Sequence, residues 1–282
     1  MERELPTILI EGTEFIIDVN KLEFREKADE RNILPLHLMK DVEGGYQFSY
    51  GLQSKNTPNI WTDEKSVTLK IPELVELDPI GMSIKYNVPV EQLRDKTDFE
   101  IMVDQDAFDQ RMKKGQLPTI DIAGEIFHVV LDKDKLIPKA DPLAHGLDIP
   151  SFGNPDHVLG DYTFAYDPIK KEIVELDYLK ILEFPMDLIA IHLPYAFRLD
   201  PIGWNINLNR DPKFGLKTIG FKMEFQSPKI PWEKTDLPEI IKENLDDLRK
   251  KQAEQKKNIP QQRAQLKTQA NETINKRKGR RM

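Results

Sequence analysis

The chain has 282 residues, enough for two domains of the commonest size, each with its own core. With 39% hydrophobic and 32% charged residues it has the composition of a soluble protein, and no apolar run approaches the ~20 residues of a membrane helix. It contains no cysteine, which excludes disulfides, thiolate nucleophiles and Cys-ligated metals. Because the first residues lack the features of a secretory signal, we expect a cytoplasmic location and no membrane span.

One sequence pattern occurs twice. Leu-Pro-Thr-Ile begins at Leu5 and again at Leu117, and Leu-Asp-Pro-Ile-Gly begins at Leu77 and again at Leu199. The order of these marks is kept while their offset grows from 112 to 122 residues, as in two copies of one fold that diverge by loop insertions. The sequence therefore predicts an internal duplication, with tandem repeats over residues 1–112 and 113–232.

Each repeat is predicted to open on a β-hairpin. In the first repeat Ile8 and Ile10 alternate with polar neighbours before Gly12, and Phe15 and Ile17 alternate after it. Glu11-Gly12 is the predicted turn, because glycine readily adopts the positive φ of a tight hairpin turn. A short strand is predicted next, over residues 22–26, and its counterpart should be interrupted by Pro138 and Pro142.

Aromatic residues mark the next strand of each repeat. Tyr46, Phe48 and Tyr50 lie on one face, as do the residues at 162, 164 and 166, and such stripes usually face a core. A further strand is predicted over residues 67–71.

An Asp-Pro pair then predicts one short helix in each repeat. The carboxylates of Asp78 and Asp200 can accept a hydrogen bond from the first turn, and proline suits the first helical position. A closing strand is predicted from the alternation of Phe99, Ile101 and Val103, with its counterpart at 221–225, and the polar residues 105–116 are predicted to connect the repeats. The predicted fold class is therefore α+β, with strand-rich repeats.

The residues after the second repeat are predicted to form a helix and a tail. Asp236 can cap a helix with Pro238 near its start, and an apolar stripe of helical period predicts a docked amphipathic helix over residues 233–257. The stripe comprises Leu237, Ile240, Ile241, Leu245 and Leu248. Trp232, just before the helix, could fix it to the second repeat or form the centre of a partner site. Residues 258–282, rich in Gln, Lys and Asn, are predicted to be a basic, disordered tail.

Charge is separated along the chain. Residues 249–282 hold twelve lysines or arginines and two acids, a net charge of +10, which leaves −17 for residues 1–248 within the total of −7. Clustered cations bind phosphates by displacing counterions, and the tail lacks aromatic residues for base stacking. The tail is therefore the candidate site for sequence-independent binding of nucleic acid or of an acidic protein partner, through Lys276, Arg277, Lys278, Arg280 and Arg281.

A second candidate is a metal site in the loop from Asp141 to Asp161. This loop holds four side chains of the kinds that bind zinc, manganese or iron, namely His145, Asp148, Asp156 and His157. Their spacing matches no known ligand pattern, and surface histidines are the ordinary alternative. For His128 and His192, which lie in apolar extended segments, a structural role is the better interpretation.

The function predicted from these features is that of a non-enzymatic binding or adapter protein. Its acidic duplicated body would hold a protein partner, and its basic tail would contact nucleic acid or an acidic partner. No cofactor is predicted, because no phosphate-binding glycine loop or nucleophile elbow is present. The alternatives are a metal-dependent hydrolase that uses residues 141–161, or a structural component of a larger protein assembly.

Overall fold

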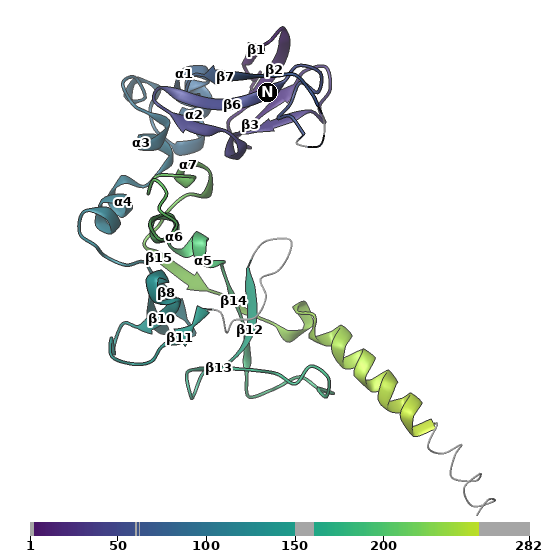
Figure 1. The fold of residues 1–282 in the computed structure, drawn as a ribbon. Coiled ribbons are helices and arrows are strands. Elements are labelled where there is room, and N and C mark those ends of the chain that lie inside the picture. The colour runs from purple at the N-terminus through teal and green to yellow at the C-terminus, as the bar shows by residue number, and fades with distance from the viewer. Residues whose placement is uncertain (1–2, 60, 62, 150–160, 254–282) are drawn as a thin grey trace, which may run out of the picture. The chain divides into compact units, whose positions relative to one another are not determined.

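The protein contains both β-sheets and helices, so its fold class is α+β. The computed structural model describes residues 3–59, 61, 63–149 and 161–253 (Figure 1). The chain divides into two compact units, residues 1–150 with 194–226 and residues 151–193 with 227–282. In the described ranges no helix is both long and apolar enough to cross a membrane.

The first unit begins with an antiparallel meander of four strands in the order β1-β2-β3-β4. Its first hairpin turns at Glu11 and Gly12, which have φ values of 47° and 77°, as the primed turns of tight hairpins require. This turn and the strand at residues 22–26 were predicted. The strands are β1 (Thr7–Ile10), β2 (Thr13–Asp18), β3 (Glu23–Glu26) and β4 (Ile33–Pro35).

A second antiparallel sheet, in the order β5-β6-β7, shares a core with this meander. Tyr46, Phe48 and Tyr50 are each no more than 5% exposed, so the aromatic stripe faces the core as predicted. Burial of three large aromatic side chains is a major apolar contribution to the stability of the unit. The strands are β5 (Lys40–Val42), β6 (Gly45–Gly51) and β7 (Ser66–Ile71).

The helices of the first repeat differ from the prediction, which allowed one. The structure has α1 (Leu74–Leu77), α2 (Pro79–Tyr86), α3 (Asp98–Met102) and α4 (Gln105–Met112). The strand predicted from Phe99, Ile101 and Val103 is therefore wrong, and the polar segment 105–116 that was predicted to connect the repeats contains helix α4. The physical reason is capping: Thr97 and Glu100 form a capping box on α3, and the carboxylate of Asp104 accepts from the amide of Ala107 at 2.9 Å on α4.

The same unit holds a third sheet, which opens on a hairpin and has the order β11-β10-β9-β8-β15. Its turn lies at Ala123 and Gly124, with φ values of 56° and 94°, and β10 ends at Pro138. The elements are β8 (Thr119–Ile122), β9 (Glu125–Val130), β10 (Lys135–Pro138), β11 (Leu147–Asp148), α5 (Ala196–Leu199), α6 (Pro201–Asn207), α7 (Leu216–Ile219) and β15 (Glu224–Ser227).

The second unit consists of a four-stranded antiparallel sheet and a helix. The sheet has the order β13-β12-β14-β16, and the helix spans residues 237–253 of the described chain. The strands are β12 (Tyr162–Asp167), β13 (Glu172–Val174), β14 (Ile189–Leu193) and β16 (Lys229–Ile230). The compact units divide the chain elsewhere than at residues 112 and 232. Because compactness and repetition are different criteria, the repeat boundaries stay a prediction.

Candidate functional sites

The predicted metal loop brings two of its four candidate ligands together. His145 Nε2 lies 3.3 Å from Asp148 Oδ2, but the Lys135 ammonium lies 2.9 Å from the other oxygen of Asp148 and holds the pKa of that carboxyl below its ordinary value. Asp156 and His157 lie outside the described residues. Within the described ranges no three His, Cys, Asp or Glu side chains are grouped so that they could hold a metal. The metal site stays a prediction, and metal content after purification without chelators tests it.

The last aspartate of that loop has a partner in the second unit. Asp161, which is 5% exposed, lies 3.1 Å from Nε2 of His192 on strand β14. The contact gives this histidine a structural partner, in agreement with the structural role expected for it. His128 Nδ1 on β9 is buried, and none of the described residues provides it with a hydrogen-bond partner.

The five basic residues of the predicted nucleic-acid site, at 276–281, lie outside the described residues. The helix before them is described as far as residue 253. Asn244 on this helix donates to the carbonyls of Tyr178 and Ile181 at 2.8 and 2.9 Å, and the indole of Trp232 donates to the Leu188 carbonyl at 3.4 Å. Leu237, at the start of the helix, is 3% exposed. The first half of the helix and Trp232 before it therefore contact the segment between β13 and β14 of their own unit.

The two Asp-Pro helix openings have a role that the sequence showed only in part. Asp78 accepts from the Gly81 amide at 2.8 Å and Asp200 from the Gly203 amide at 2.9 Å, so both cap their helices as predicted. Each carboxylate also forms a bidentate ion pair, a contact that the sequence analysis missed. The partner of Asp78 is Arg3, which donates to its two oxygens at 2.6 and 2.5 Å. The partner of Asp200 is Arg111, which donates to Oδ1 at 3.2 Å and to Oδ2 at 2.9 Å.

The spacing of the repeats does not predict the positions of these arginines. Arg3 precedes the Leu-Pro-Thr-Ile segment by two residues and Arg111 by six, so the repeat pattern does not include them. The carboxylates of Asp78 and Asp200 are 2% and 1% exposed, which means that each buried charge needs its guanidinium partner. These aspartates therefore hold helix α2 to the segment before β1, and helix α6 to helix α4.

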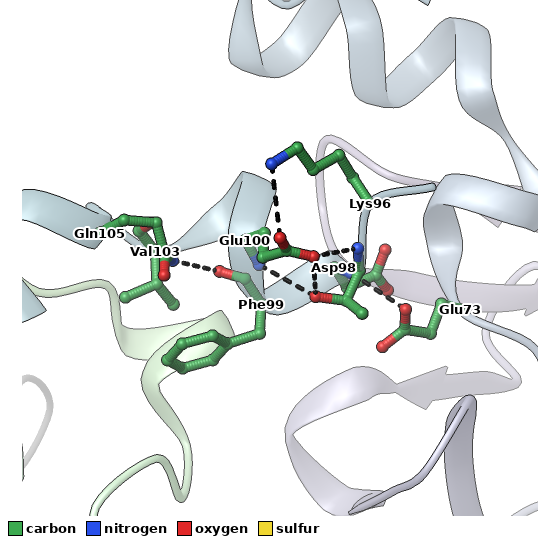
Figure 2. Close-up of polar contacts among 8 residues, drawn as sticks. Glu73, Lys96, Asp98, Phe99, Glu100, Val103 and Gln105 are labelled. Carbon is green, nitrogen blue, oxygen red and sulfur yellow. Dashed lines mark hydrogen bonds and ion pairs between the residues drawn. The ribbon is translucent and has the colours of Figure 1, made fainter. Parts of the chain in front are cut away.

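A second group of buried acids joins α1 to α3 (Figure 2). Asp98 is fully buried and accepts from the amides of Leu74 and Val75 at 2.6 and 2.8 Å and from the Tyr46 hydroxyl. Its own amide donates to Glu73 at 3.1 Å. Burial raises the pKa of Glu73 above its ordinary value, the Asp98 amide opposes this rise, and the Asp98 charge adds to it.

Figure 2 also shows the capping box that places Asp98 at the start of α3. The Thr97 amide donates to Glu100 at 2.9 Å, and this bond lowers the pKa of the Glu100 carboxyl. Gln105 closes the other end of the helix by donating to the carbonyls of Phe99 and Val103 at 2.9 and 2.8 Å. All of these polar groups are used in capping, so the cluster has a structural role.

Next to this cluster, the first unit contains a cavity of about 400 Å³. Lys217 on α7 is 8% exposed, and its ammonium lies 2.6 Å from Asp41 and 4.2 Å from the centre of the Tyr46 ring. Since Asp41 balances this charge, the cavity offers mainly apolar contacts, from Leu36, Met39, Phe214 and Ile219. Sequence analysis missed the site because its parts come from distant segments.

The chain was compared with protein-family models, curated proteins and solved structures, and none of them matches it.

Proposed function

We propose that the chain is a non-enzymatic adapter whose acidic, internally duplicated α+β body holds a protein partner while its basic tail binds nucleic acid. The observation that carries the proposal is charge segregation, with +10 over residues 249–282 against −17 over residues 1–248. A cationic segment next to an acidic body favours long, polyanionic ligands that can follow the tail without approaching the body.

Matching local structure supports the duplication within the proposal. Both Leu-Pro-Thr-Ile segments lead into two-residue hairpins with the same register, and both Asp-Pro pairs cap a helix and bind an arginine. Two unrelated segments would not be expected to share a sequence, a turn geometry and a buried ion pair. The duplication also accounts for the constant order of these marks along the chain.

The test is fluorescence anisotropy of labelled single- and double-stranded DNA and RNA across a salt series. In the full chain, Lys276, Arg277, Lys278, Arg280 and Arg281 are changed to glutamine. If these five residues contact phosphates, the slope of log K against log salt should decrease in magnitude by about 3.5 to 4.5, at 0.7–0.9 per contact.

The matched control changes five exposed lysines of the body to glutamine, which alters the net charge equally. They are Lys65, Lys114, Lys133, Lys139 and Lys229. This control should leave the slope unchanged. Equal losses in both variants would show a general charge effect, and an absence of binding by the full chain at low salt would refute nucleic-acid binding. Capture of an acidic protein that depends on the same five tail residues would assign the tail to a protein partner instead.

A further inference from the structure

The two hairpins that begin with Leu-Pro-Thr-Ile differ in one respect: a strand covers the outer edge of only one of them. In the hairpin β1-β2, Ile8 pairs with Phe15 and Ile10 with Thr13, and the Ile17 amide donates to the carbonyl of Pro6 at 2.9 Å. Because hydrogen-bonded pairs alternate in an antiparallel ladder, the amides and carbonyls of residues 7 and 9 point away from β2.

The hairpin β8-β9 repeats this pattern, with the Val129 amide donating to the Pro118 carbonyl at 2.9 Å. Here the outward amide of Thr119 is used, because it donates to the Met223 carbonyl at 2.8 Å where β15 lies alongside β8. Thr7 occupies the equivalent position of β1. In the described part of the chain, however, no strand pairs with the outer edge of β1.

The sequence of β1 does not protect this edge. Natural edge strands commonly carry a lysine, a proline or a bulge that blocks further pairing. Strand β1 reads Thr-Ile-Leu-Ile, without charge or proline, and Leu9 is 72% exposed. The equivalent of Leu9 on β8 is the charged residue Asp121. An uncharged edge that exposes a leucine is suited to pairing with another strand.

Helix α2 shows the same difference. Ile80 of α2 and Ile202 of α6 occupy equal positions in the Asp-Pro-Ile-Gly segments, but Ile80 is 53% exposed and Ile202 is fully buried. Ile202 packs in a cluster with Val103, at the C-terminal end of α3, and Ala107, within α4. Two elements of the first repeat therefore expose surfaces that are covered in their counterparts.

We infer that the outer edge of β1 binds an extended segment of a partner protein, which adds a strand to the sheet as β15 does on β8. The inference deepens the proposed adapter function and rests on it for a protein partner of the body. Glu4 and Glu11, both exposed, lie on either side of β1, so a strand with basic flanks fits. Strand β15 has this character, since Lys222 and Lys229 flank it.

A second copy of the chain fits the edge less well. Symmetric antiparallel pairing about Ile8 would hydrogen-bond Thr7 of one copy to Leu9 of the other. The same register would bring Glu4 of each copy near Glu11 of the other, and like charges at these positions oppose pairing. Each strand has only four residues, so the pair would also bury little surface.

The test uses the full chain, labelled with ¹⁵N, and a synthetic peptide of residues 220–230 as the probe strand. In the free protein the amides of Thr7 and Leu9 should exchange with solvent faster than those of Ile8 and Ile10. Addition of the peptide should shift the Thr7 and Leu9 resonances and slow their exchange. The variant Leu9→Pro removes an outward amide at a position where edge strands tolerate proline, and it should weaken binding at least tenfold.

The control variant Leu9→Thr keeps the amide and should bind the peptide within about threefold of the original, since main-chain hydrogen bonds provide much of the affinity in strand addition. Slow exchange at Thr7 and Leu9 in the free protein would overturn the inference, because the edge would already be covered. Shifts at Thr119 alone would mean exchange with β15, and shifts that depend on protein concentration alone would mean self-association. An absence of shifts at about 1 mM peptide would also overturn it. None of these outcomes depends on the tail, so adapter binding through the tail can succeed or fail independently.

Discussion

The ion pair between Arg111 and Asp200 should be a main source of stability in the first unit, and Arg111→Ala tests this. Asp200 is 1% exposed at its side chain and Arg111 is 16% exposed, so removal of the guanidinium leaves a buried carboxylate with one remaining bond, from the Gly203 amide. Removal of one partner of a buried pair costs about 3–5 kcal/mol. We expect a value near 3 kcal/mol, because the helix cap is kept and water can enter the space of the lost side chain.

A double-mutant cycle separates the ion pair from the packing of Arg111. Asp200→Asn keeps an oxygen that can cap α6 but removes the charge. In that background Arg111→Ala should cost only about 1 kcal/mol, which gives a coupling energy of about 2 kcal/mol. Urea unfolding followed by far-UV circular dichroism and by tryptophan fluorescence, to which Trp204 within α6 contributes, measures each variant.

The matched control is Lys113→Ala at the end of the same helix. Lys113 pairs with Asp109 at 2.7 Å, but the two side chains are 71% and 43% exposed, so the loss should be below about 0.5 kcal/mol. Arg3→Ala should lie between these values, near 2 kcal/mol, because Arg3 is 29% exposed and can be replaced partly by water. A coupling energy between Arg111 and Asp200 below about 0.5 kcal/mol would refute a stabilising role for the pair.

Three further predictions follow from the first and second units. Glu73→Gln should raise the free energy of unfolding at pH 7, and this gain should disappear as the pH falls through the raised pKa of Glu73, because the native carboxyl is then protonated and neutral. Urea titrations at several pH values measure the gain, and a gain that grows toward acid would contradict the prediction. Lys217→Met should lower the free energy of unfolding by at most about 1 kcal/mol, since it keeps the packing of the side-chain stem and Asp41 is partly solvated. Lys217→Ala should lower it by about 2 kcal/mol or more through the lost packing, and equal shifts in melting temperature for the two variants would argue against this. Trp232→Ala should speed limited proteolysis of the helix at 237–253, because the hydrogen bond from its indole to the Leu188 carbonyl is lost. Trp61→Ala is the control, since the Trp61 side chain is 86% exposed, and equal cleavage rates in the two variants would show that Trp232 does not fix the helix.

Several features that depend only on neighbouring residues were predicted from the sequence. The hairpin turn at Gly12 and the caps at Asp78 and Asp200 each need only a few adjacent positions, and all are present in the structure. The ion pairs could not be predicted, because Asp78 lies 75 residues from its partner and Asp200 lies 89 residues from its own. Such contacts depend on how distant elements pack, which periodicity does not report.

The closing strand shows how local chemistry decides between two structures for one pattern. Residues 99–103 and 221–225 have the same alternation of apolar side chains, yet the first segment forms helix α3 and the second leads into strand β15. Thr97 and Glu100 supply a capping box for the helix, whereas Gly220 adopts a φ of 76° and ends helix α7 just before the second segment. In residues 97–103 the capping box therefore outweighs the apolar alternation.

That difference also determines which sheet edge stays open. Residues 224–227 are extended and lie beside β8, where the carbonyl of Met223 accepts from the Thr119 amide. The residues at the matching positions of the first predicted repeat, 102–105, belong to helices α3 and α4 and the segment between them, so they are unavailable to pair with β1. The capping box that forms α3 thus keeps this segment from pairing with the Thr7 and Leu9 amides, which no other strand of the described residues covers. A partner strand on β1 would take the place that β15 takes on β8, which the residues of α3 and α4 leave unfilled beside β1.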